Sequence, residues 1–187
     1  MPEGANRPPV LDRVTERMAG FHRPWALCGG WAVDAWLGRQ TREHLDVDLA
    51  IDDDDQLALR GYLRDGWLLN GHDPHDDDST QAWDGHPLEL PAHIHARGHD
   101  LDLDFQLNAH AGDALVLGPT PRTSLARSEA VATSPWGLPT FTPVAILFFK
   151  RRGPVRPNDQ TDIDLLTPLL GTPQQAWLSA ALAEDAR

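Results

Sequence analysis

The chain's architecture follows from two neighbouring segments, Leu27-Cys28-Gly29-Gly30-Trp31-Ala32-Val33-Asp34-Ala35-Trp36-Leu37-Gly38 and Leu45-Asp46-Val47-Asp48-Leu49-Ala50-Ile51. In the first, an apolar run stops at two glycines and resumes at Trp31, which predicts a strand, a tight glycine turn and a helix that Gly38 ends. In the second, apolar and acidic residues alternate with the period of a half-buried strand. We therefore expect Asp46 and Asp48 on one side of this strand and Leu45, Val47, Leu49 and Ile51 on the other.

A second acidic strand is predicted over residues 100–107, Asp100-Leu101-Asp102-Leu103-Asp104-Phe105-Gln106-Leu107. Its alternation places the aspartates opposite an apolar stripe. Alternate residues of a strand lie roughly 6.5 to 7 Å apart and point the same way, so Asp46 and Asp48 can share hard divalent cations with an acid of a neighbouring strand. Asp104 is the predicted third carboxylate, and Asp102 is the alternative.

The remaining pattern predicts an α+β fold, a mixed β-sheet flanked by helices with a short C-terminal helical tail. We expect further strands over 67–69, 88–96 and 114–117, and helices over 9–20, 56–64, 144–151, 159–170 and 176–182. Residues 71–85 are expected to form a long surface loop, and most of 109–139 to be irregular. Residues 1–139 would form an α/β core, and residues 140–187 a helical segment packed on it.

Composition narrows the classes of partner. The 187 residues carry a formal net charge of -12, which disfavours nucleic acid, because proteins that bind phosphate backbones usually present a basic face. The acidity is compatible with a cationic small molecule, and equally with a solubility role. One cysteine, Cys28, excludes a disulfide framework. No signal-like or membrane-spanning run occurs, so we expect a cytoplasmic protein without a membrane partner.

The combination of a glycine pair and a downstream Asp-x-Asp resembles the DNA polymerase β-like nucleotidyltransferase superfamily. More narrowly, residues 29–42 running into His44-Leu45-Asp46-Val47-Asp48 are similar to the aminoglycoside 2''-O-nucleotidyltransferase and lincosamide nucleotidyltransferase group. The likeness is close over residues 27–51 and loose elsewhere. It implies a nucleotidyltransferase-like fold and an adenylyltransferase-like enzyme.

The resemblance also implies roles for particular residues. Gly29 and Gly30 would hold the triphosphate of ATP or another NTP. Asp46 and Asp48 would bind Mg²⁺, with two ions present during catalysis. Asp104 would either complete the metal site or act as the general base for an acceptor hydroxyl.

Three basic residues are further candidates for the nucleotide site. Lys150, followed by Arg156-Pro157-Asn158-Asp159, resembles a Lys and Arg-Pro-Lys-Asp pattern of related enzymes, with Asn158 in place of the second lysine. Lys150 would contact phosphate, or simply cap a helix C-terminus. Arg42 and His44 would contact phosphate or orient Asp46, although charge pairing in a surface turn explains them equally well.

Two other groups of side chains are candidates for binding roles. The first is a set of histidines, of which His93 and His95 would share a face of a strand. Without cysteines or a recognised spacing, the set does not predict a zinc site; its members are His72, His75, His86, His93, His95 and His99. Trp83 and Trp136 lie in loop-like surroundings, so we expect them to be exposed, where they could line an acceptor pocket.

The predicted activity is Mg²⁺-dependent transfer of a nucleoside monophosphate, AMP first among them, from an NTP to a hydroxyl of a small molecule. The resemblance implies an aminoglycoside or lincosamide antibiotic as acceptor, and hence antibiotic resistance. Two alternatives remain: a toxin–antitoxin-type nucleotidyltransferase that modifies a protein partner, and a domain that binds nucleotide without catalysis. The preferred NTP, the hydroxyl modified and the oligomeric state are left open by the sequence.

Overall fold

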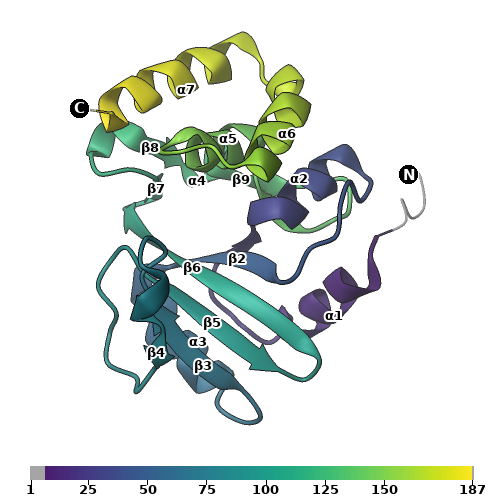
Figure 1. Ribbon diagram of the computed structural model, residues 1–187, viewed down its shortest axis with the longest axis vertical. Helices are drawn as coiled ribbons and strands as arrows, with labels where there is room; N and C mark the ends of the chain where they lie inside the picture. Colours follow the sequence, from purple (N-terminus) through teal and green to yellow (C-terminus); the bar gives the residue numbers. More distant parts are fainter. Residues whose placement is uncertain (1–6, 187) are drawn as a thin grey trace.

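The computed structural model describes residues 7–186 and has the predicted α+β architecture (Figure 1). A mixed sheet has the strand order β4-β3-β5-β6-β2-β1-β10-β9, and β7 and β8 extend it from β6. The strands are β1 Trp25–Leu27, β2 Val47–Asp52, β3 Leu68–His72, β4 Gln81–Ala82, β5 His93–Gly98, β6 Leu101–Ala111, β7 Ala114–Val116, β8 Ser124–Ala126, β9 Val131–Thr133 and β10 Pro139–Phe141. The helices are α1 Pro9–Met18, α2 Gly29–Leu37, α3 Gln56–Tyr62, α4 Arg127–Ala130, α5 Pro143–Arg151, α6 Pro157–Leu166 and α7 Thr172–Asp185.

Strands β2 and β6 form the centre of the sheet and pair in parallel, with Asp48 directly opposite Asp104. The predicted alternation holds along β6, where Leu101, Leu103 and Phe105 are buried while the aspartates between them are partly accessible. A parallel pair puts registered side chains on the same face of the sheet. The acids of the two strands therefore share the polar face.

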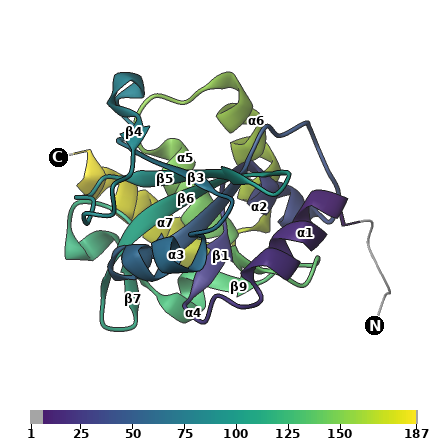
Figure 2. The ribbon, with the colours of Figure 1, turned by 90° about the horizontal axis from the view of Figure 1, so that it is seen from below.

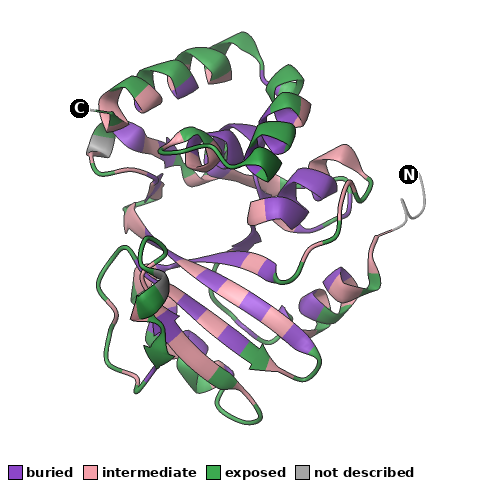
Figure 3. Cartoon of the chain, in the orientation of Figure 1, coloured by how far each residue is buried: buried purple, intermediate pink, exposed green. Residues whose placement is uncertain are grey.

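The apolar face of this part of the sheet is covered by α1 and α3, which lie on the same side of it (Figure 2). Leu11, Val14 and Met18 of α1 are fully buried, as expected for a helix that places one apolar stripe against a sheet. The purple stripes of Figure 3 mark this buried side along the strands. The opposite face is left free to carry polar chemistry.

The C-terminal helices join the core through a strand that the sequence pattern had not predicted. Pro139–Phe141 forms β10, which pairs in parallel with β1. Trp36 of α2 donates its indole N–H to the carbonyl of Phe141 at 2.7 Å. Helix α5 follows directly, with Val144 to Phe148 buried, and α6 and α7 contact it (Figure 1). The proposed division at residues 139 and 140 stays a prediction.

Several predicted boundaries were wrong. Leu45 is 97% exposed and precedes β2, which begins at Val47. Residues 88–92 lie outside β5, and residues 124–133 form β8, α4 and β9 where irregular chain was expected. The glycine pair begins α2 instead of forming a separate turn before it.

Both tryptophans expected at the surface are buried. Trp83 is 6% exposed and donates its indole N–H to the carbonyl of His86, and Trp136 is 5% exposed. Their loop-like surroundings misled the prediction, because large aromatic side chains bury area wherever neighbouring elements leave room for them. Neither lines the cleft that holds Asp48 and Lys150.

Candidate active site

A cleft of about 1760 Å³ separates the polar face of the sheet from the C-terminal helices. Its sheet side carries the glycine pair and the three predicted carboxylates, and its helical side carries four basic residues, Lys150, Arg151, Arg152 and Arg156. Opposite charges thus face each other across one opening. Every predicted site residue lines this cleft: Gly29, Gly30, Arg42, His44, Asp46, Asp48, Asp104 and Lys150.

Asp48 points directly at the first residue of α2. A Cβ atom placed on Gly29 would overlap the carboxylate of Asp48, and Gly29 has φ +60, a conformation that favours glycine. The amide of Cys28 donates to the carbonyl of Asp48 at 3.0 Å, which fixes the strand beside the helix. The glycine is therefore required so that the carboxylate can lie against the start of α2.

The carboxylates of Asp46, Asp48 and Asp104 repel one another electrostatically. Burial, together with the charges of Asp46 and Asp104, raises the pKa of Asp48 to about 6 against the opposing effect of His93 and Lys150. Burial also raises the pKa of Asp46, with Asp104 and Asp102 adding repulsion. Crowded carboxylates of this kind are stabilised by a cation placed between them.

The donor set fits Mg²⁺ on the side of Asp46 and Asp48. Both offer only carboxylate oxygens, the ligands that Mg²⁺ prefers, and the repulsion that raises their pKa values is what a divalent cation relieves. Asp104 differs, because two histidines already hold it. His93 Nδ1 lies 2.6 Å from its Oδ2, and His72 Nε2 lies 3.2 Å from its Oδ1.

These hydrogen bonds change the acidity of Asp104. Burial by itself raises the pKa of this carboxyl, but the hydrogen bonds and charges of His93 and His72 outweigh burial and leave the pKa below its ordinary value. Asp102, the alternative third carboxylate, instead pairs with His95 and Arg97. The register opposite Asp48 and this pairing favour Asp104.

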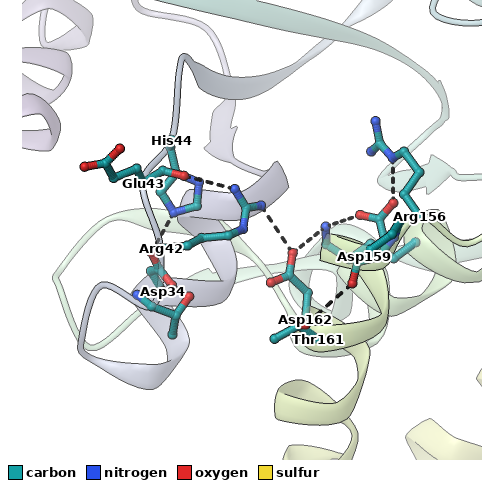
Figure 4. A network of polar contacts seen from close by, with 11 residues as sticks. Asp34, Arg42, Glu43, His44, Arg156, Asp159, Thr161 and Asp162 are labelled. Atoms are coloured by element: carbon teal, nitrogen blue, oxygen red, sulfur yellow. Dashed lines mark hydrogen bonds and ion pairs between the residues drawn. The ribbon is translucent and has the colours of Figure 1, made fainter.

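Arg42 and His44 lie against the second glycine. A Cβ on Gly30 would come within 2.6 Å of Nη2 of Arg42 and of the ring of His44. Asp34 of α2, which is fully buried, anchors this loop by accepting from His44 Nε2 at 2.7 Å and from the amide of Thr41 at 3.0 Å (Figure 4). The side chains of Arg42 and His44 thus occupy the space that a side chain at position 30 would need.

Replacing Asp34 with alanine is expected to destabilise the protein by about 2 to 3 kcal/mol, because His44 and Thr41 lose a buried acceptor. Urea unfolding measures the change. Asp164→Ala is the control: this exposed residue of α6 accepts one hydrogen bond from Gln160, so its removal should change stability by less than about 0.5 kcal/mol. Equal effects of the two changes would contradict an anchoring role for Asp34.

Lys150 lies in a network of ion pairs between α5 and α6. Its Nζ lies 2.8 Å from both Asp159 Oδ1 and Asp162 Oδ2. Arg156 donates to Asp159 at 2.7 Å, and Arg42 reaches Asp162 from the loop before β2 at 3.5 Å (Figure 4). The network holds Lys150 at the cleft wall and connects the glycine segment to the C-terminal helices.

Sequence reasoning did not place Asp34 or Asp162 in the site, and it considered His72 and His93 only for a zinc site that it did not predict. The apolar run around Asp34 was a usable signal, because a lone acid inside a buried helix needs partners. His72 gave no comparable signal, since β3 was expected to end at residue 69. Its approach to Asp104 depends on the register of β3 and β5, where His72 pairs with His93.

Comparison with known proteins agrees with this geometry. The family model described as Aminoglycoside-2''-adenylyltransferase matches residues 10–73, about a third of the chain. No curated protein sequence matches significantly.

Solved structures share the fold over nearly the whole chain. ANT(2'')-Ia in complex with adenylyl-2''-tobramycin has a TM-score of 0.64 at 18% identity, covering 96% of this chain and 98% of its own. The lincomycin-bound lincosamide adenylyltransferase LnuA has a TM-score of 0.61 at 17% identity, covering 87% and 97%. An antigenic nucleotidyltransferase-like protein from Paracoccidioides brasiliensis has a TM-score of 0.53 at 18% identity, covering 94% and 85%.

The predicted resemblance and the predicted fold class are confirmed by these matches. No helix in the described part of the chain has the length and apolar character needed to cross a membrane. The chain is thus similar to the aminoglycoside-2''-adenylyltransferase family over residues 10–73, and as a whole it has the fold of ANT(2'')-Ia and LnuA.

Proposed function

We propose that this protein is a Mg²⁺-dependent nucleotidyltransferase that moves a nucleoside monophosphate, AMP in the first place, from an NTP to a hydroxyl of a small molecule. The observation that carries the proposal is the position of Asp48. It lies against the first turn of α2, directly opposite Asp104, on the wall of a cleft whose other wall is basic. This arrangement suits an enzyme that binds a polyanion at the basic wall and a metal ion at the acid pair.

Asp46 and Asp48 are the residues that would hold Mg²⁺, with Asp104 proposed as the third carboxylate. When bound, the metal neutralises charge on the phosphates and positions them for in-line displacement. The protein's own contribution is to hold the two acids close despite their repulsion. The strand pairing of β2 with β6 holds Asp48 opposite Asp104, the glycine at position 29 leaves room for the Asp48 carboxylate, and Asp46 lies immediately before β2.

The basic residues of the cleft would bind the triphosphate. Lys150 is held at the wall by Asp159 and Asp162, and Arg156 lies exposed beside it. Arg42 has a further unused donor, because its Nε is buried without a hydrogen-bond partner among the described residues. Gly29 and Gly30 would offer backbone N–H groups at the start of α2, where the helix adds favourable partial charge.

The acceptor proposed is an aminoglycoside or a lincosamide. The reaction would take place in the cytoplasm and would confer antibiotic resistance. Two structures of the same fold were solved with such compounds, tobramycin as its adenylyl adduct and lincomycin. The net charge of -12 favours the polycationic aminoglycosides, because an acidic protein concentrates cations near its surface.

Incubation with Mg²⁺ and α-labelled NTPs tests the proposal against a panel of aminoglycosides and lincosamides. We expect labelled adduct and pyrophosphate with at least one antibiotic, and ATP to be the best donor. Label that transfers to protein instead would support the toxin–antitoxin alternative. Nucleotide binding without pyrophosphate release for any acceptor would support the non-catalytic alternative and contradict the proposal.

A further inference from the structure

His72 and His93 converge with Asp104 on the cleft wall, and the proposed phosphate chemistry requires neither histidine. They come from three adjacent strands, β3, β5 and β6. One ligand atom from each lies within 4.8 Å of the other two, and all three side chains are partly buried. The two imidazole rings meet edge to face with centroids 5.3 Å apart.

The sheet register produces this convergence. His72 pairs with His93 across β3 and β5, and His93 pairs with Gln106 across β5 and β6, two residues along the strand from Asp104. Registered positions share a face, and diagonal neighbours stay within reach of long side chains. The cluster is therefore fixed by backbone pairing and does not depend on a loop.

We propose that His72 Nε2, His93 Nδ1 and an oxygen of Asp104 form a binding site for a borderline divalent transition metal such as Zn²⁺. Two imidazole nitrogens and one carboxylate are typical ligands of Zn²⁺, whereas Mg²⁺ prefers oxygen alone. Ligands at about 2.0 to 2.2 Å from one Zn²⁺ ion lie a little over 3 Å from each other. His72 Nε2 already lies 3.2 Å from Oδ1 of Asp104, whereas His93 Nδ1, at 2.6 Å from Oδ2, forms a hydrogen bond that metal binding would lengthen.

The site opens on the cleft, so a metal held by these three residues keeps one position for an oxygen donor. Three protein ligands and an open position are the arrangement of catalytic zinc sites. The open position takes water or an acceptor hydroxyl. Its use in acceptor binding rests on the proposed function, but metal binding at the three residues does not.

Zinc binding to the full chain tests the inference. The protein is stripped with chelator, supplied with millimolar Mg²⁺ to occupy Asp46 and Asp48, and titrated with ZnCl₂ by calorimetry without nucleotide. We expect one equivalent of Zn²⁺ to bind with micromolar or tighter affinity. His93→Ala and His72→Ala should each weaken binding by at least about 10-fold, and Co²⁺ should give the visible spectrum of a nitrogen-ligated site in the wild type alone.

His95→Ala is the matched control, because His95 lies on the same strand and pairs with Asp102. His95→Ala should leave the affinity for Zn²⁺ unchanged. A second cluster of possible metal ligands consists of His110, Asp53 and Asp54. His110→Ala removes one ligand of that cluster and should also leave the affinity for Zn²⁺ unchanged. Circular dichroism checks that each variant folds. If His72→Ala or His93→Ala does not fold, Asp104→Asn is used in its place.

Absence of stoichiometric Zn²⁺ binding to the wild type would overturn the inference, as would a loss confined to the His95 or His110 variant. The Asp48→Asn variant separates this result from the proposed function. It should lose nucleotidyl transfer while it still binds Zn²⁺.

Discussion

The Asp48→Asn variant should lose nucleotidyl transfer, with kcat/KM lower by about 10³-fold. Asparagine keeps the size of the side chain and removes its charge, so the glycine segment has no steric reason to move. The loss should appear in kcat more than in KM for the NTP, because the variant keeps Lys150 and Arg156, the residues proposed to bind the phosphates. Release of pyrophosphate from NTP, with the acceptor found in the panel, measures it.

Asp102→Asn is the control for this change. Asp102 lies on the same face of β6 but is paired with His95 and Arg97. Its replacement should leave kcat/KM within about 10-fold of the wild type, a smaller loss than removal of one electrostatic stabiliser usually causes. Comparable losses in the two variants would show that general acidity of the face, and not the position of Asp48, supports the reaction.

The same Asp48→Asn change should stabilise the metal-free protein at neutral pH. Burial, with repulsion from Asp46 and Asp104, raises the folded-state pKa of Asp48 from its ordinary value of 3.8 to about 6. A carboxyl with a raised pKa contributes stability at low pH that is lost as pH rises from about 4 to 6. At pH 7 its charge thus costs up to about 3 kcal/mol.

Urea unfolding of both proteins at pH 4.5 and pH 7.5, with chelator present, measures this effect. The variant should gain stability over the wild type at the higher pH and little at the lower. Added Mg²⁺ should reduce the difference in the free energy of unfolding between the variant and the wild type, because it stabilises the wild type. A variant that is less stable at pH 7.5 would contradict the description of Asp48 as a buried, repelled charge.

The sequence predicted the polar face of the sheet because the strand period is two. Once β2 and β6 are placed side by side, alternation alone puts Asp48 and Asp104 on one face. It could not predict where β2 begins. Leu45 has the right parity, but it precedes the paired residues, so nothing covers it and it is exposed.

The partners of each charge could not be predicted either. Lys150 was expected to contact phosphate or to cap a helix C-terminus, and its ion pairs with Asp159 and Asp162 were not predicted. Those acids lie on the next helix, and only the angle between α5 and α6 brings them to the lysine. Likewise, His72 and His93 lie together beside Asp104 because of the register in which β3 and β5 pair, and no local pattern in the sequence specifies that register.

Gly29→Ala should nearly abolish transfer as well, and it should also destabilise the fold. The added Cβ would overlap the carboxylate of Asp48, so either the aspartate or the first turn of α2 must move. A displacement of about 1 Å at a catalytic group can cost about 10²-fold in rate. The left-handed φ of +60 adds a strain of about 1 to 2 kcal/mol for any residue with a Cβ.

Gly38→Ala separates the two effects. Gly38 ends α2 with φ +66, but a Cβ there meets nothing within 4 Å. Its replacement should therefore lower stability by about the same backbone strain and leave kcat/KM nearly unchanged. If Gly29→Ala lowered stability no more than Gly38→Ala and retained activity, Asp48 would have room to move, and the glycine would serve the backbone alone. A loss of activity in Gly29→Ala but not in Gly38→Ala would instead mean that position 29 has no side chain so that the carboxylate of Asp48 can lie against the start of α2.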